Sequence, residues 1–89
     1  LMKVLREYGV EELGALYLYL PVPERPDDRE ARAWLRVLMA RRLVISGPWR
    51  IEASRAPPWL KKTHPGIASE DVALYEIYRL KRDRLATLV

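Results

Sequence analysis

The sequence contains no cysteine, asparagine or glutamine. Without cysteine the chain forms no disulfide, no zinc–thiolate site and no catalytic thiol. The two missing amides are thermolabile residues that proteins of hyperthermophiles tend to lose, and the 12 arginines and seven prolines fit the same interpretation. We therefore predict a cytoplasmic protein of a thermophile, with a GC-rich genome as the alternative origin of this composition.

Long apolar runs and the motifs of common enzymes are also missing. No apolar segment approaches the roughly 20 residues of a membrane-spanning helix, so we expect no membrane partner. There is no glycine-rich phosphate loop, no serine–histidine–acid arrangement and no recognisable acid/base pair of carboxylates. His64 is the only histidine, whereas a metal site needs several ligands at defined spacing. The sequence predicts a protein that is not an enzyme and has no metal or cofactor.

The charge that is present is unevenly distributed along one small domain. The chain of 89 residues has a net charge of +4 and allows a single modest core. Residues 1–28 carry three cations and six anions, whereas residues 29–89 carry the other 13 cations and six anions. This asymmetry predicts a basic surface that faces a polyanion. The alternative is that the positive charge only keeps the domain soluble.

The apolar spacing near the N-terminus predicts two helices and a stiff connector. Residues 1–8 place their apolar side chains on one helical face, and Gly9 is a suitable stop. Residues 10–20 fit a second helix, although the apolar run 16–20 is also compatible with a strand. Their leucines and their acidic start favour the helix. Three prolines in residues 21–26 then exclude both helix and central strand.

A basic amphipathic helix followed by a tight hairpin is expected in the middle of the chain. Asp27 is a good N-cap for a helix over residues 27–42. The apolar residues 43–45 then indicate a strand, 46–48 a turn, and 49–53 a returning strand with alternating side chains. On that strand Trp49 is expected to face the core rather than to offer a stacking surface to bases.

The C-terminal third is expected to be a loop and a last helix. Residues 56–68 are a basic loop that contains prolines. Ser69 is a preferred N-cap, so we predict a helix over residues 69–89 that packs on the core or forms a dimer seam. The residues of that candidate seam are Leu74, Tyr75, Tyr78, Leu85 and Leu88.

The succession of these segments resembles the winged helix-turn-helix superfamily over about the first 55 residues. The helix-to-strand junction is carried by the stretch Ala33–Val44, which reads AWLRVLMARRLV. The resemblance implies a mainly α fold with a small β-hairpin, in which residues 1–55 form a winged-helix-like core. That core would have three helices and a short wing, followed by the C-terminal helix.

The basic residues of this arrangement are the candidates for binding nucleic acid. Three arginines at three- and four-residue spacing share one helical face, which suits entry into a major groove. The alternative is a solvated face on which Arg32 pairs with Asp28. Cations of the returning strand and of the basic loop are expected to contact phosphates. The predicted nucleic-acid-binding residues are Arg29, Arg32, Arg36, Arg50, Arg55, Lys61 and Lys62.

Two classes of function follow from the resemblance. The first is a DNA-binding transcriptional regulator or chromatin-type protein, with double-stranded DNA or RNA as its partner. The second is a non-catalytic adaptor subunit of a larger transcription, replication or ribosomal assembly, which would bind protein through aromatic and leucine side chains. Either class is compatible with a homodimer. A steep dependence of affinity on salt would favour the first class.

Overall fold

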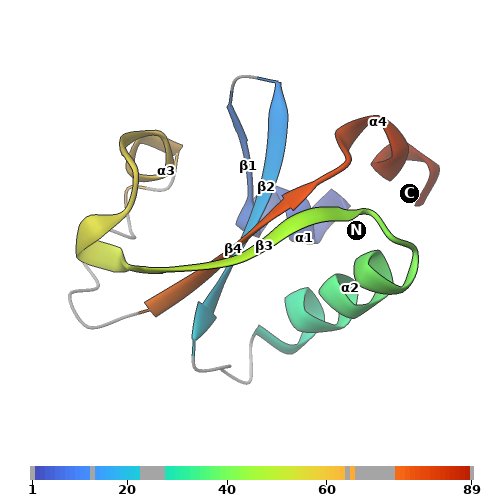
Figure 1. The fold of residues 1–89 in the computed structure, drawn as a ribbon, viewed down its shortest axis with the longest axis horizontal. Coiled ribbons are helices and arrows are strands. Elements are labelled where there is room, and N and C mark those ends of the chain that lie inside the picture. The colour runs from blue at the N-terminus through green and yellow to red at the C-terminus, as the bar shows by residue number, and fades with distance from the viewer. Residues whose placement is uncertain (1, 13, 23–27, 64, 66–73, 89) are drawn as a thin grey trace.

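The computed structural model describes residues 2–12, 14–22, 28–63, 65 and 74–88 (Figure 1). Four strands are present in this part of the chain: β1 (Gly9–Glu12), β2 (Ala15–Val22), β3 (Val44–Glu52) and β4 (Leu74–Leu80). The α-helices are α1 (Met2–Tyr8), α2 (Arg29–Ala40), α3 (Pro58–Thr63) and α4 (Arg82–Leu85). Two short 3₁₀ helices, η2 (Ala53–Arg55) and η4 (Ala86–Leu88), follow β3 and α4. None of these helices is long and apolar enough to cross a membrane.

The strands form one antiparallel sheet in the order β1-β2-β4-β3. Both β2 and β3 run antiparallel to β4, so they are parallel to each other with β4 inserted between them. Helix α2 connects β2 to β3 and lies on one side of the sheet, whereas α3 lies on the other (Figure 1). The strand that comes last in the chain therefore lies at the centre of the sheet.

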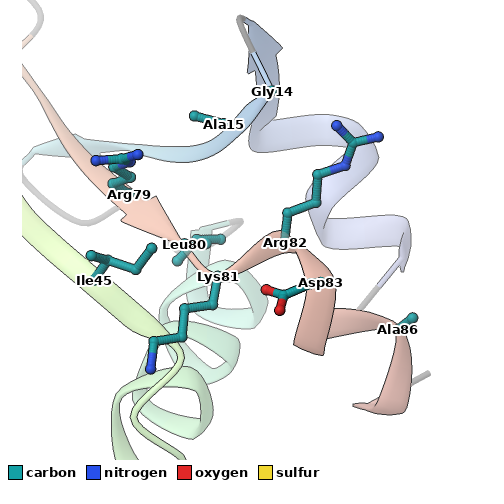
Figure 2. A pocket seen from close by; sticks show the side chains of 9 residues that line it. All are labelled: Gly14, Ala15, Ile45, Arg79, Leu80, Lys81, Arg82, Asp83 and Ala86. Atoms are coloured by element: carbon teal, nitrogen blue, oxygen red, sulfur yellow. The ribbon is translucent and has the colours of Figure 1, made fainter.

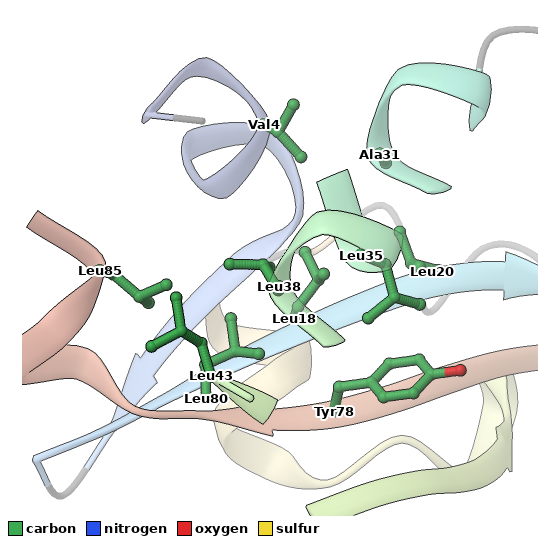
Figure 3. Close-up of a cluster of buried hydrophobic side chains, with 10 residues drawn as sticks. All are labelled: Val4, Leu18, Leu20, Ala31, Leu35, Leu38, Leu43, Tyr78, Leu80 and Leu85. Carbon is green, nitrogen blue, oxygen red and sulfur yellow. The ribbon is translucent and has the colours of Figure 1, made fainter. Parts of the chain in front are cut away.

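The sheet separates two hydrophobic cores. The larger one joins residues of β2, β4 and three helices (Figure 3), and its members are Val4, Leu18, Leu20, Ala31, Leu35, Leu38, Leu43, Tyr78, Leu80 and Leu85. The second core lies beneath η2 and α3 and consists of Val10, Tyr19, Ala53, Ala56, Leu60, Tyr75 and Ile77. Successive side chains of a strand point to opposite faces. Strands β2 and β4 therefore contribute to both cores and are buried on both sides.

Helix α2 agrees with the sequence prediction in position and in its apolar face. It buries Ala31, Leu35 and Leu38, whose spacing of four and three residues defines one stripe of a helix. It ends in a Schellman arrangement, in which the Leu43 amide bonds the Leu38 carbonyl at 2.8 Å and Arg42 adopts a positive φ of 58°. Helix α1 also matches its predicted range.

The predicted mainly α, winged-helix-like fold is wrong, and the first reason is the second predicted helix. Residues 10–20 belong instead to the hairpin of β1 and β2. Leu18 and Tyr19 are both buried, but in different cores on opposite faces of the sheet. A strand that is buried on both faces has a continuous apolar run without alternation, and such a run also fits a helical stripe.

The predicted wing is also absent, because residues 46–48 do not form a turn. They lie within β3, where the pairing with β4 shifts register between Val44 and Ser46 and again before Trp49. Strand β3 is an edge of the sheet, and Pro48 is tolerated there because an edge strand needs no donors on its outer side. Gly47 has a φ of 126°, and a Cβ at this position would lie 2.7 Å from the carbonyl oxygen of Ile77.

The C-terminal predictions are wrong for the residues that the structure describes. The range predicted as the last helix contains the central strand β4 and the short helices α4 and η4. The predicted loop 56–68 contains helix α3. The proposed cap residues Asp27 and Ser69 lie outside the described residues, as do His64 and most of the connector 21–26.

Candidate functional site

The arginines predicted on one exposed face of α2 have different surroundings. Arg29 and Arg36 are exposed, whereas the side chain of Arg32 is only 15% exposed and turns towards the sheet. Its Nη1 donates a hydrogen bond to Glu76 Oε2 at 2.9 Å, and its Nη2 donates to the carbonyl oxygen of Pro21. Arg32 therefore joins α2 to two strands and is not free to contact a ligand.

Glu76, at the centre of β4, is the acceptor of a small polar network on the α2 side of the sheet. The residue is only 7% exposed. Besides Arg32 it accepts hydrogen bonds from Arg50 Nε at 3.3 Å and from the Tyr78 hydroxyl at 3.0 Å. Buried carboxylates require such partners, because an unpaired buried charge is costly. The network is thus a structural element that holds α2, β3 and β4 together.

The network changes the pKa values of its two titratable members. Burial raises the pKa of the Glu76 carboxyl, but hydrogen bonds from Arg32 and Tyr78 and the positive charges of Arg32 and Arg50 outweigh it, so that the pKa is lowered. Burial, together with the hydrogen bond to the Glu76 carboxylate, raises the pKa of Tyr78. At neutral pH Glu76 is therefore ionised and Tyr78 is a neutral donor.

The other predicted phosphate contacts lie on β3, η2 and α3. Arg50 is mostly exposed but remains paired with Glu76. Arg55 forms an exposed ion pair with Glu52, with 3.5 Å between Nε and Oε2. Lys61 donates to the carbonyl oxygen of Ser54 at 3.2 Å, and Lys62 is exposed on α3. Arg50 shares Glu76 with Arg32 of α2. Arg55, Lys61 and Lys62 instead belong to η2 and α3, which cover the second core.

The residues of the predicted dimer seam do not share a surface. Tyr78 and Leu85 are buried in the larger core, whereas Tyr75 is buried in the core on the opposite face. Leu74 is half-buried at the start of β4, and the side chain of Leu88 lies outside the described part of the chain. A strand alternates its side chains between two faces, so the seam expected for a helix cannot form here.

Within the part of the chain that the structure describes, one part of the sheet is left uncovered on the side of α3. Helix α3 packs against the β1–β2 half of this face, where Trp59 and Tyr17 have their ring centroids 4.9 Å apart. On the β3–β4 half, Trp49 is 46% exposed and Ile45 is 49% exposed. The prediction that Trp49 lies in the core is therefore wrong, because α3 does not extend over it.

An exposed arginine lies in the same uncovered area. Arg79 of β4 is directly opposite Ser46 of β3 and Tyr17 of β2, and Trp49 is opposite Ile77, two residues earlier in β4. Directly opposite residues and residues two apart point to the same face. Trp49 and Arg79 thus share one surface. Ile45, which precedes a register shift in β3, lines a hollow together with Arg79. We call the surface formed by Trp49, Ile45 and Arg79 the open sheet face.

A hollow of about 540 Å³ extends this face to the end of β4 (Figure 2). It is lined by Gly14, Ala15, Ile45, Arg79, Leu80, Lys81, Arg82, Asp83 and Ala86. Arg82 is paired with Glu11 of β1. For Arg79 and Lys81 no ion pair is found within the part of the chain that the structure describes.

A second hollow continues the surface around the edge of β3. It has a volume of about 280 Å³ and shares Ile45 with the first hollow, and its lining adds Met39 and Arg42 from the end of α2. The backbone brings these two ends together, since the Lys81 amide donates to the Leu43 carbonyl at 2.9 Å. The open sheet face is therefore bordered by cations on the side of Lys81 and Arg42.

No protein-family model, no curated protein and no solved structure matches the chain. Fold and site together define a small three-layer α+β protein with a basic, partly apolar patch on its antiparallel sheet. Arg79 and Lys81 were not among the predicted site residues, because the sequence placed them in an expected helix. Arg79 follows Tyr75 and Ile77 at the two-residue spacing of one strand face, and that spacing could have indicated a strand.

Proposed function

We propose that this protein binds nucleic acid through the open sheet face and its border of cations, and not through α2. The observation that supports this proposal is which cations near the sheet are paired with a carboxylate and which are not. Arg50 and Arg32 are held by Glu76, whereas Arg79 and Lys81 have no carboxylate partner among the described residues. Unpaired, solvent-exposed cations on one surface are the usual means of binding a phosphate backbone.

Charge around the hollow supports the same proposal. Among the described lining residues three are cations and one, Asp83, is an acid. Because Arg82 already has Glu11 as a partner, Arg79 and Lys81 supply the excess positive charge. A concave surface with an excess of one charge raises the local concentration of oppositely charged ligands.

Helix α2 is the less suitable surface. Its predicted recognition face lacks Arg32, which is bound to Glu76 and Pro21. The helix begins beside Asp28 and carries Glu30 in its first turn, and these acids would repel phosphates at the end that a recognition helix usually presents. Arg29 and Arg36 remain exposed there, so they provide a matched control.

The experiment compares two double variants that remove the same charge from opposite sides of the sheet. Arg79→Ala/Lys81→Ala and Arg29→Ala/Arg36→Ala are titrated with labelled DNA and RNA of about 20 nucleotides at low and moderate salt. We expect the first variant to lose about tenfold in affinity and to reduce the salt slope by about 2. The second variant should change affinity far less. Equal losses, or no binding of the wild type at low salt, would contradict the proposal.

The alternative function, a non-catalytic adaptor that binds protein, has one observation in its favour. Val37 and Met39 are exposed on α2, and Met39 is 54% exposed beside the second hollow. An adaptor of this kind would bind none of the oligonucleotides at low salt. The same titration therefore separates the two functions.

A further inference from the structure

We infer that the open sheet face takes a single strand of nucleic acid, with an unpaired base stacked on Trp49 and the backbone held by Arg79 and Lys81. This inference rests on the proposed function and specifies its ligand. The exposed groups of this face include an aromatic and an aliphatic side chain as well as cations.

The apolar part of the face is the first argument. Trp49 and Ile45 are each about half exposed in an area that also holds Arg79. Phosphates have no favourable contact with an indole ring or with the sec-butyl side chain of isoleucine, whereas the π-face of a base stacks on such a ring. A duplex keeps its base faces inside the helix and presents mainly phosphates and groove edges. Among nucleic acids, the exposed indole therefore favours a strand whose bases are unpaired.

The order of side chains across the sheet is the second argument. Across the sheet, Tyr17 of β2 lies opposite Arg79 of β4. Trp49 of β3 lies opposite Ile77, which is two residues before Arg79 in β4. Tyr17 is itself stacked with the half-buried Trp59 of α3. Arg79 thus stands between two aromatic groups, and two strand residues correspond to about 7 Å. A nucleic-acid strand that crosses the open sheet face meets the aromatic Trp49 and then the cationic Arg79, and the face ends at the Tyr17–Trp59 pair that α3 covers.

The shape of the described surface is the third argument. No hairpin projects from the sheet at residues 46–48, and the arginine that faces the sheet from α2 is bound to Glu76. A duplex groove is normally read by a projecting helix or ribbon. The open sheet face offers instead a shallow platform that continues into the hollow beside Lys81. Such a combination of a cationic groove and an aromatic platform suits single strands.

The test uses the intact chain and three ligands with about 20 nucleotides per strand: oligothymidylate, an abasic strand with the same phosphate backbone, and a DNA duplex. We expect oligothymidylate to bind more tightly than either of the others at equal salt. Trp49→Ala should weaken oligothymidylate binding about tenfold, to the level of the abasic strand. Unchanged binding of the abasic strand by this variant also shows that the variant is folded.

Three further variants make the result specific. Trp49→Phe keeps an aromatic ring and should retain most of the preference for oligothymidylate over the abasic strand. Val37→Ala removes an exposed apolar side chain of α2 that lines neither hollow and should leave all three affinities unchanged. Arg79→Ala/Lys81→Ala should weaken all three ligands, because it removes phosphate contacts.

The outcomes separate the inference from the proposed function. Equal binding of oligothymidylate and the abasic strand, or tighter binding of the duplex, overturns the single-strand inference while nucleic-acid binding stands. An unchanged preference in Trp49→Ala also overturns it. No binding of any ligand by the wild type at low salt overturns the proposed function itself.

Discussion

Arg32 and Glu76 form an ion pair across 44 residues of sequence, with 2.9 Å between Nη1 and Oε2. One partner lies on α2 and the other at the centre of β4, so the pair fixes the helix on the sheet. Both side chains are largely removed from solvent. An arginine that the sequence suggested as a groove contact thus has a structural role, and the ligand-binding charge lies elsewhere.

Removing the charge of Glu76 should destabilise the protein substantially. Glu76→Gln leaves Arg32 partly buried without a counter-charge, and loss of one partner of a buried pair costs about 3 kcal/mol in the free energy of unfolding. Urea unfolding followed by circular dichroism measures the difference. Glu52→Gln is the control, because it breaks the exposed pair with Arg55 and should cost less than about 1 kcal/mol. Equal losses in the two variants would contradict the structural role of the pair.

The stability that Glu76 contributes should disappear in acid. Its pKa in the folded protein is lowered, so the folded state favours the ionised form more than the unfolded state does. The contribution is present above the unfolded pKa of about 4.3 and is lost as the pH falls through the lower folded pKa. The difference in unfolding free energy between wild type and Glu76→Gln should therefore shrink from pH 6 towards about pH 2. A difference that stays constant over this range would argue against a charged Glu76.

Gly47→Ala should destabilise the protein more than Gly14→Ala. Both glycines have positive φ, 126° and 76°, and a side chain in such a conformation costs about 1 kcal/mol by itself. At Gly47 the new Cβ would also lie 2.7 Å from the Ile77 carbonyl oxygen, whereas nothing lies within 4 Å at Gly14. The difference between the two losses, measured as unfolding free energies, reports the close approach of β3 to β4. Equal losses of unfolding free energy in the two variants would mean that β3 can move away from β4 at no cost in stability.

Adjacent positions on α2 should respond very differently to truncation. Leu38 is fully buried in the larger core, whereas Met39 is exposed. Leu38→Ala should cost about 2–5 kcal/mol, since it removes buried apolar area and leaves a cavity. Met39→Ala should change the unfolding free energy by less than about 0.5 kcal/mol. The reverse order of losses would show that α2 presents another face to the sheet.

Helices α1 and α2 of this fold are predictable from sequence, whereas helix α3 and the central strands are not. Helix α2 has one buried stripe, and its amphipathic spacing therefore identifies it. Strands β2 and β4 alternate between two cores, as Leu18 and Tyr19 do, so neither shows the polar–apolar alternation of a half-exposed strand. Residues 46–48 look like a turn because glycine and proline favour turns, but both residues also fit an irregular edge strand.

The candidate site was predictable only in part. A basic surface follows from the charge distribution, but its position depends on which cations meet carboxylates in three dimensions. Arg32 is not available to a ligand because it is bound to Glu76 of β4, 44 residues away in the sequence. The spacing of residues along the chain does not predict that contact. Trp49 was recognisable as a residue of interest, yet its exposure depends on how far α3 extends over the sheet.

The most direct test of where the ligand binds is a ¹H–¹⁵N NMR titration of the wild-type protein with oligothymidylate at low salt. Binding at the open sheet face predicts that the indole N–H signal of Trp49 and the amide signals of Ser46, Arg79 and Lys81 shift. The indole signal of Trp34, which packs against the larger core on the other side of the sheet, should remain in place. Shifts confined to Arg29, Arg36 and their neighbours on α2 would contradict the account.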